Sequence, residues 1–177
     1  MAVKKKYYSW HDLEEQVQDL VYQLYKSPWK PDYIVGLTRG GLTPATILSN
    51  RLDIPMYALD VRLRDTTEGY RAESNQCMAQ DAFGYDERSD GIKWNSDLVK
   101  NILIVDDIND SGATFEWIKN DWQNNCESRD DRWRHVWHNN VRFAVLTNNL
   151  GSTQDVDFYV DEVNKTEKPV WLVYPWE

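Results

Sequence analysis

One segment near the middle of the chain constrains the fold more than any other. Residues 102–114 read ILIVDDINDSGAT. The four apolar residues at its start, most of them β-branched, are typical of a buried parallel strand, and a helical pattern follows from Thr114 to about Asn124. Because a buried strand, a polar turn and a helix in this order form part of a β-α-β unit, the segment predicts an α/β domain with a mainly parallel sheet.

The rest of the chain agrees with that architecture. Ser9 is a candidate helix N-cap with Asp12 at the capping-box position, and apolar residues then recur at helical spacing as far as Leu24. Pro44 suits the first turn of a helix that runs to about Leu52. Apolar, β-prone runs predict strands at residues 33–37, 54–63, 98–105, 141–147 and 158–160. We therefore expect one domain over residues 1–177.

The composition and the net charge limit which classes of binding partner are expected. Among 177 residues the net charge is −9, and no basic block extends beyond Lys4 to Lys6, which argues against nucleic acid as the main partner. A small phosphorylated ligand is compatible with this charge, since backbone N–H groups and a metal ion can hold phosphates in an acidic protein. No apolar run reaches the ~20 residues of a membrane span, and no apolar stretch follows the N-terminal lysines. Cys77 and Cys126 share no motif spacing, so a reducing cytoplasm is the expected location.

The turn after the central strand has groups that suit phosphate and ribose. In open α/β sheets, ligands bind beyond the carboxyl ends of the strands, where Asp106 and Asp107 are expected. The N–H groups of residues 110–114 can point at one anion at the start of the helix, and Gly112 permits close approach. The adjacent carboxylates suit ribose hydroxyls or a hydrated Mg²⁺. A capped helix without a ligand is the alternative, but neighbouring carboxylates repel each other unless a cation or hydroxyl donors lie nearby.

This segment closely resembles the motif that binds 5-phosphoribosyl 1-diphosphate (PRPP) in type I phosphoribosyltransferases. The resemblance implies the type I phosphoribosyltransferase fold, an α/β fold with a mainly parallel central sheet flanked by helices and a small hood from the C-terminal segment. It implies that Asp106 and Asp107 serve the ribose, with Mg²⁺ at Asp107, and that Asp110 transfers a proton at the purine. It also implies that the 5′-phosphate is held by Asp110, Ser111, Gly112, Ala113 and Thr114.

A second resemblance lies upstream, at the end of the first expected sheet strand. Residues 35–42, VGLTRGGL, are similar to the family's diphosphate loop, in which the peptide before the first glycine is often cis. The resemblance implies that Thr38, Arg39 and Gly40 bind diphosphate, together with the amide of Gly41. A plain turn is the alternative for this short motif taken by itself.

The polar stretch at about residues 64–97 matches the family's mobile catalytic loop in place, and some local strand pairing is expected within it. Such a lid would exclude water from the reacting ribose. Arg62, Arg64 and Arg71 are candidates to close over diphosphate, with a solvated arginine as the alternative for each. The chain also has an insertion at about residues 125–140 that could be an oligomer contact.

The C-terminal tail suggests the base. Residues 171–176, WLVYPW, resemble the tail of bacterial xanthine–guanine phosphoribosyltransferases, which implies that Trp171 stacks on a purine and that Leu172 contacts it through its backbone. A core tryptophan is the alternative. In these enzymes a lysine just after the strand predicted here at 141–147 binds the purine 6-oxo group. Here that place falls at Asn148 or Asn149, and we take Asn148 as the base contact. Lys165 is too far along the chain to be an obvious substitute, and the same holds for Lys168.

The resemblance implies an enzyme of purine salvage. It would transfer 5-phosphoribose from PRPP to hypoxanthine, guanine or xanthine with Mg²⁺, releasing a nucleoside 5′-monophosphate and diphosphate. Two alternatives stay open: a PRPP- or nucleotide-binding regulator of the same fold without turnover, and a phosphoribosyltransferase for a different base. A homo-oligomer, dimer or tetramer, is expected by the same resemblance, with no membrane partner.

Overall fold

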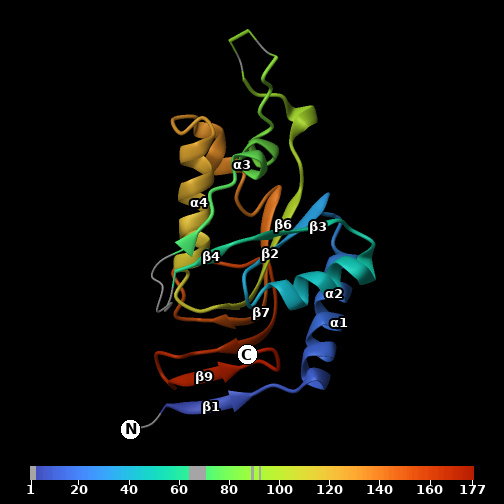
Figure 1. The fold of residues 1–177 in the computed structure, drawn as a ribbon, viewed down its shortest axis with the longest axis vertical. Helices are drawn as coiled ribbons and strands as arrows, with labels where there is room; N and C mark the ends of the chain where they lie inside the picture. Colours follow the sequence, from blue (N-terminus) through green and yellow to red (C-terminus); the bar gives the residue numbers. More distant parts are fainter. Residues whose placement is uncertain (1–2, 64–70, 89, 92) are drawn as a thin grey trace.

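The computed structural model describes residues 3–63, 71–88, 90–91 and 93–177. A five-stranded sheet forms its centre, with the strand order β3-β2-β6-β7-β8 (Figure 1). All four strand pairs are parallel. The strands are β3 (Met56–Leu59), β2 (Tyr33–Leu37), β6 (Ile102–Asn109), β7 (Val141–Asn149) and β8 (Phe158–Val163). The predicted α/β class with a mainly parallel sheet is therefore confirmed.

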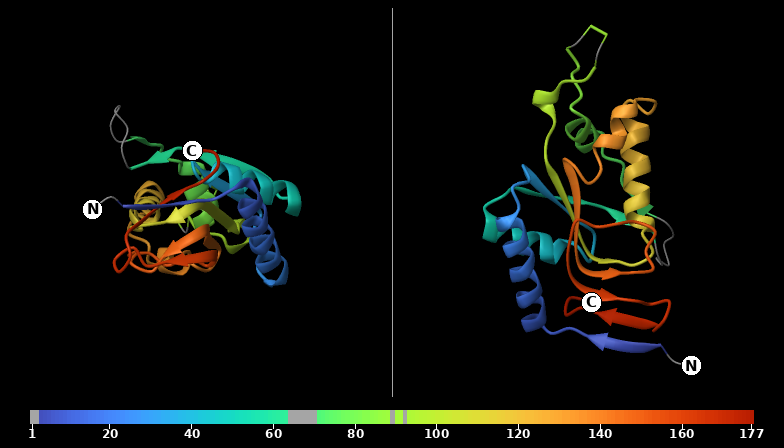
Figure 2. Two further views of the ribbon diagram at one scale, coloured as in Figure 1. Left: turned by 90° about the horizontal axis from the view of Figure 1, so that it is seen from below. Right: turned by 180° about the vertical axis from the view of Figure 1, so that it is seen from behind.

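Helices cover both faces of this sheet. The helices α1 (Trp10–Lys26) and α2 (Leu42–Leu52) lie on one face, and α4 (Ala113–Asn125) lies on the other (Figures 1 and 2). Successive residues of β6 alternate between the two resulting cores. Ile102 and Ile104 pack in the core that contains α4, whereas Leu103 packs in the core that contains α1 and α2. Both faces of the sheet are thus buried from water at β6, which explains the unbroken apolar run at the start of this strand.

The first helix begins where the sequence predicts it. The side chain of Ser9 accepts a hydrogen bond from the amide of Asp12, and Asp12 Oδ2 accepts one of 2.6 Å from the amide of Ser9. This capping box satisfies two amides that the helix itself leaves without partners. Leu13, Val17 and Leu20 are then buried against the sheet.

Several predicted strands differ in their bounds. The strand expected at residues 54–63 is split into β3 and β4 (Val61–Arg62), and β4 turns to pair antiparallel with β5 (Arg71–Ala72). The strand expected at 98–105 begins later, because a 3₁₀ turn, η1, occupies Ser96–Leu98. It also ends later: β6 pairs with β7 as far as Asn109, so the acidic pair lies within the strand and not after it.

The segment expected as a long loop contains a helix that the sequence analysis missed. α3 (Gln76–Phe83) is capped by Asn75 and ends at Gly84, whose φ is 77°. Met78, Ala79, Ala82 and Phe83 are buried. Of the local pairing expected within this segment, the described residues have one antiparallel bridge, between Tyr85 and Trp94; β5 pairs with β4, which lies before the segment. Residues 64–70 lie outside the described part of the chain, so mobility there stays a prediction.

The insertion at residues 125–140 is packed against the core. It contains a 3₁₀ turn, η2 (Asp131–His135), which buries Trp133 to 2% exposure. The Trp133 ring stacks on Trp137 at 5.5 Å, and its Nε1 donates to the carbonyl of Cys126 at 2.7 Å. An oligomer contact at this insertion stays a prediction.

A two-stranded hood lies beyond the carboxyl edge of the central sheet (Figure 1). It pairs β9 (Val170–Val173) in parallel with β1 (Lys4–Tyr7), so both ends of the chain build it. The sequence predicted only the C-terminal contribution. Tyr174 fastens the hood, since its ring stacks on Tyr8 at 4.7 Å and its hydroxyl lies 2.7 Å from Thr147 Oγ1 on β7. In the described part of the chain, no helix is long and apolar enough to cross a membrane.

Candidate active site

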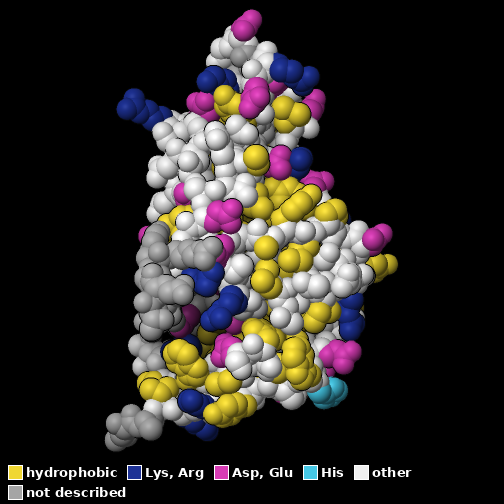
Figure 3. Space-filling model, viewed as in Figure 1, with side chains coloured by type: hydrophobic (Ala, Val, Ile, Leu, Met, Phe, Trp, Pro, Cys, Tyr) yellow, Lys and Arg dark blue, Asp and Glu magenta, His cyan; other side chains and the backbone are white. Residues whose placement is uncertain are grey.

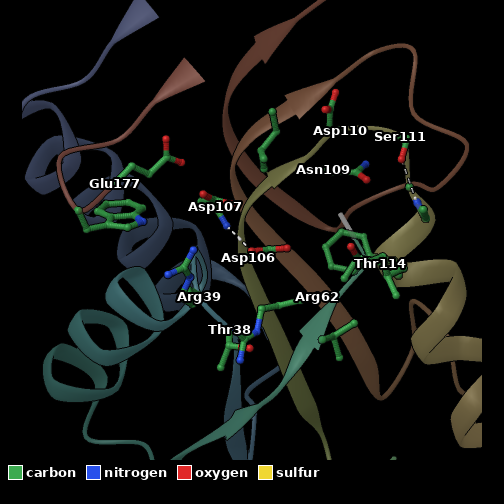
Figure 4. A pocket seen from close by; sticks show the side chains of 18 of the residues that line it. Thr38, Arg39, Arg62, Asp106, Asp107, Asn109, Asp110, Ser111, Thr114 and Glu177 are labelled. Carbon is green, nitrogen blue, oxygen red and sulfur yellow. Dashed lines mark hydrogen bonds between the residues drawn. The ribbon is translucent and has the colours of Figure 1, made fainter. Parts of the chain in front are cut away.

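A cavity of about 640 Å³ opens between the hood and the carboxyl edge of the sheet. Its wall is formed by the turn after β2, by β4, by the end of β6 with the turn into α4, and by residues of the hood segment. In the space-filling view, basic and acidic side chains lie close together in this region of the molecule (Figure 3). The close view shows Arg39 and Arg62 on one side of Asp106, with Asp110 and Ser111 on the other (Figure 4).

The turn into α4 forms one part of the cavity wall. Asp110, Ser111, Gly112, Ala113 and Thr114 all line the cavity. The helix begins after Gly112, which has a φ of 87° and no side chain to cap the first turn. A Cβ there would lie 2.7 Å from Thr153 Oγ1, so the close packing of this turn requires glycine. The arrangement suits one anion at the positive end of the helix dipole.

The acidic pair lies in the second half of β6. The amide of Asp107 donates to Asp106 Oδ1 at 2.9 Å (Figure 4). Part of the Asp106 side chain is open to the cavity. Desolvation by the surrounding protein, followed by the charge of Asp107, nevertheless raises the pKa of Asp106 well above its usual range. Burial also raises the pKa of Asp107, against hydrogen bonds that lower it. A bound cation or hydroxyl donors would relieve this repulsion.

The turn after β2 touches the acidic pair. A Cβ on Gly40 would lie 2.3 Å from Asp107 Oδ2, so only glycine fits there. The cis peptide of this loop joins Thr38 and Arg39, one residue earlier than the resemblance implied. Thr38 and Arg39 line the cavity.

The structure describes only part of the three arginines that were expected to bind diphosphate. Arg62 lines the cavity, and its guanidinium makes two hydrogen bonds to Asp60, of 2.8 and 3.0 Å. The backbone of Arg71 pairs with Arg62 across β4 and β5. The side chain of Arg71 and the whole of Arg64 lie outside the described part of the structure.

The residues expected to bind the base are not all brought together. Trp171 lines the cavity from the hood and is 56% exposed. Leu172 is buried beneath it at 7% exposure. Asn148 is absent from the cavity wall, and its Oδ1 instead accepts a hydrogen bond of 2.9 Å from Asn109.

Two further residues of the tail reach the cavity without having been expected there, Trp176 and Glu177. Burial, followed by the nearby charge of Asp107, raises the pKa of Glu177. No local motif identifies this residue, because its proximity to Asp107 depends on how the hood folds back over the sheet.

Lys165 lies nearer to the site than its place in the chain indicates. The sequence analysis did not take it as a substitute for the base-binding lysine, and that stays a prediction, but its Nζ lies 3.2 Å from Asp110 Oδ1. The loop after β8 returns to the end of β7, where the amide of Lys165 donates to Asn149 Oδ1 at 3.0 Å. This return is a tertiary contact, and only the adjacent pair of asparagines at 148 and 149 was visible in the sequence.

Asp106 and Asp107 are the carboxylates that could hold a metal ion. Within the described ranges no cluster of three or more histidine, cysteine, aspartate or glutamate side chains is arranged as a metal site. Mg²⁺ commonly takes one or two carboxylates and completes its shell with water and substrate oxygens. The acidic pair therefore has the donors for Mg²⁺ in the presence of a substrate that carries oxygens.

Comparison with known proteins identifies relatives of the whole chain. The family model described as "Phosphoribosyl transferase domain" matches residues 4–176. A xanthine-guanine phosphoribosyltransferase of Cereibacter sphaeroides is 26% identical over 175 residues, covering 96% of this chain and 84% of the relative. The solved purine phosphoribosyltransferase of Pyrococcus horikoshii is 25% identical with a TM-score of 0.61, covering 98% of this chain and 94% of the other. A Helicobacter pylori xanthine-guanine-hypoxanthine phosphoribosyltransferase shares the fold, at 20% identity, a TM-score of 0.63, and coverage of 98% and 93%.

Proposed function

Because this chain belongs to the phosphoribosyltransferase family, we propose that it transfers 5-phosphoribose from PRPP to a purine base. The acceptor would be hypoxanthine, guanine or xanthine, and the products a nucleoside 5′-monophosphate and diphosphate. The observation that carries the proposal is the convergence of two glycine-containing turns, an acidic pair and an exposed tryptophan on one cavity. The names of the xanthine-guanine relatives support the choice of a purine.

Each part of PRPP has a suitable partner in the proposed complex. The 5′-phosphate would bind the amides of the turn at residues 110–114, where the dipole of α4 favours an anion. The ribose hydroxyls would donate to Asp106 and Asp107. The diphosphate would bind the turn of Thr38, Arg39 and Gly40, with Arg71 closing from β5.

Mg²⁺ is proposed to bind with PRPP at Asp107. The fit rests on the donor set, since burial and mutual repulsion make two carboxylates favourable partners for a cation. When bound, the ion supplies positive charge that stabilises the departing diphosphate.

Asp110 is proposed as the residue that moves the proton. The bond from the ribose C1′ to diphosphate breaks as the bond from C1′ to the base nitrogen forms, and the base loses a proton. Asp110 would accept this proton, and its position on the cavity wall beside the proposed phosphate turn supports the role. Trp171 would stack on the base, with Leu172 contacting it through the backbone.

A panel of bases tests the reaction. Purified protein with PRPP and Mg²⁺ is offered hypoxanthine, guanine, xanthine, adenine and uracil, and diphosphate release is measured. Turnover with one or more 6-oxopurines is expected. If PRPP binds in calorimetry but none of the bases reacts, the regulator becomes the better hypothesis, and turnover with uracil alone would indicate a different base.

The same resemblance leads us to propose a homo-oligomer, either a dimer or a tetramer. Light scattering coupled to size-exclusion chromatography measures the mass directly. A mass equal to that of one 20.9 kDa chain would contradict it.

A further inference from the structure

The insertion at residues 125–140 brings a histidine to a lysine of α4, outside the cavity. Lys119 Nζ lies 3.2 Å from His138 Nε2, and His138 Nδ1 lies 3.1 Å from Asp157 Oδ2. None of these three side chains lines the cavity. The same oxygen of Asp157 accepts a hydrogen bond of 2.8 Å from the amide of Phe143, so the backbone of β7 holds the carboxylate in place.

The aspartate determines which ring nitrogen of the histidine is left to accept a proton. A carboxylate has no hydrogen to donate, so Nδ1 of His138 carries the hydrogen of its bond to Asp157. In the neutral ring Nε2 is then the acceptor, and it faces the amine of Lys119 at hydrogen-bond distance. A nucleophile, a base and an orienting third group in this order form the arrangement that activates nucleophiles in enzymes.

The surroundings of Lys119 favour its neutral amine. Its Nζ lies 5.1 Å from the centroid of the Phe143 ring, a poor solvent for a charge. Burial lowers the pKa of Lys119, although the charges of Asp157 and Asp155 act in the opposite direction. Because the uncharged amine is the nucleophile, a lower pKa increases the reactive fraction at neutral pH. The residue is only partly buried, so a small reagent has access to it.

The acceptors around this amine favour one class of modification. Gln154 Oε1 accepts a hydrogen bond of 2.9 Å from Nζ, and an amide formed on Lys119 keeps one N–H for this contact. A carbamate formed with carbon dioxide would instead place a negative charge near Asp155 and Asp157, where like charges repel. The site therefore accommodates a neutral acyl group better than an anionic one.

We propose that Lys119 is a site of acylation, at which its amine attacks an activated acyl group of a small thioester or acyl phosphate, with His138 as the base. The bond from Nζ to the acyl carbon forms, and the bond from that carbon to the leaving sulfur or oxygen breaks with its electron pair. His138 Nε2 takes the proton that Nζ loses and returns it to the leaving group. The product is an amide one contact away from the turn of residues 110–114, because Gln154 lies against Gly112.

Site-resolved mass spectrometry tests the proposal without requiring any phosphoribosyl transfer. The full-length protein is incubated with acetyl phosphate or, in a second arm, with the uncharged thioester S-ethyl thioacetate, and the initial acetylation rate of each lysine is measured. Lys100 is the internal control, since its partner at 3.0 Å is the carboxylate of Asp81 and not an imidazole. Lys119 should react at least roughly tenfold faster than Lys100 in one or both arms, which is less than a fully aligned base provides because the amine is partly buried. The arm that reacts identifies the class of donor.

His138→Asn tests the role of the base. Asparagine tolerates the positive φ of 61° at this position and can still donate to Asp157, but it cannot take up a proton. The acetylation rate of Lys119 should fall by about tenfold, to that of the internal control. His11→Asn is the matched control, because His11 also lies beside a carboxylate, Glu15 at 3.5 Å, on the exposed surface of α1. It should leave the rate unchanged.

Two results would overturn the proposal. The first is an equal rate at Lys119 and Lys100 in both arms. The second is an unchanged rate at Lys119 in His138→Asn, because the imidazole would then be a packing partner only. Should His138→Asn fail to give a cooperative thermal transition, His138→Gln undergoes the same measurements with the same criteria, and the comparison of lysines within the wild type is decided without either variant.

Discussion

The two ends of the strands in the central sheet, here called its amino edge and its carboxyl edge, are packed in opposite ways. At the amino edge, aromatic rings close around one another, with Trp133 between Phe83 at 5.4 Å and Trp137 at 5.5 Å. The buried polar residue there, Asn140, donates to the carbonyls of Ala82 and Lys100 at 2.9 and 3.0 Å. At the carboxyl edge, Asp106 and Asp107 are adjacent in β6, and desolvation raises the pKa of both carboxyl groups.

The two edges therefore contribute to the free energy of unfolding with opposite sign. Packed aromatic rings with satisfied polar groups stabilise the amino edge. Burying like charges costs free energy, and a native protein tolerates that cost where a ligand relieves it. We therefore expect substitutions at the amino edge to change stability, and substitutions at the carboxyl edge to change activity.

The largest expected effect is on turnover. Asp110→Asn keeps the size of the side chain but removes the proton acceptor, so kcat should fall by roughly 10²- to 10⁴-fold, while KM for PRPP changes little because the turn amides remain. Steady-state diphosphate release measures both constants. Asp131→Asn makes the same change at an exposed position of the amino edge and should leave kcat unaltered. Equal kinetics in the two variants would remove Asp110 from the proposed mechanism.

The next effect is on stability. Trp133→Ala removes a ring that is 2% exposed, together with its hydrogen bond to Cys126, and should lower the free energy of unfolding by about 3–5 kcal/mol. Urea denaturation measures this change, with kcat determined below the transition. Tyr25→Ala, at a position that is 78% exposed, should change stability by less than about 0.5 kcal/mol. If Trp133→Ala lowered kcat and left the urea midpoint unchanged, the assignment of stability to the amino edge and of activity to the carboxyl edge would be wrong.

A smaller effect is expected at the hood. Trp171 is 56% exposed, so Trp171→Ala should leave stability nearly unchanged but raise KM for the base, by an amount that corresponds to about 1–3 kcal/mol for one stacked base. Tyr22→Ala, on α1 with 53% exposure, is the matched control. An unchanged KM for the base in Trp171→Ala would assign the tryptophan to the hood surface alone.

The sequence predicted the parts of this architecture that depend on local patterns. The capping box of Ser9 and Asp12, and the glycine turn into α4, lie within a few residues of one another, and both are found where expected. β1 was missed because Lys4–Tyr7 is exposed along its whole length and shows no alternation. α3 was missed because it spans only eight residues within a stretch whose overall polarity and glycines favoured a long loop. The approach of Lys165 to Asp110 depends on a loop that returns across the sheet, which no spacing along the chain reveals.

The last prediction concerns the cost of the acidic pair itself. The pKa of Asp106 is raised by burial and then by the charge of Asp107. A carboxyl whose pKa is higher in the folded protein than in the unfolded chain contributes its full stability below the ordinary value of 3.8, and loses it as the pH rises through the folded value. Asp106→Asn stays neutral at every pH and should avoid that loss. At pH 7 it should be more stable than the wild type by about 0.5–2 kcal/mol, while catalysis becomes weaker.

Thermal unfolding between pH 3 and pH 8, without Mg²⁺, measures this prediction. The difference between Asp106→Asn and the wild type should grow with pH above about 4 and vanish at the acid end, where both side chains are neutral. Asp81→Asn is the control, since Asp81 is a partly buried carboxylate with a cationic partner, Lys100, at 3.0 Å. Removing it should destabilise the protein at neutral pH, because a salt bridge is lost and no repulsion is relieved. A variant at Asp106 that is less stable than the wild type at pH 7 would show that the pair supports the fold, and the contrast between the two edges would then rest on activity alone.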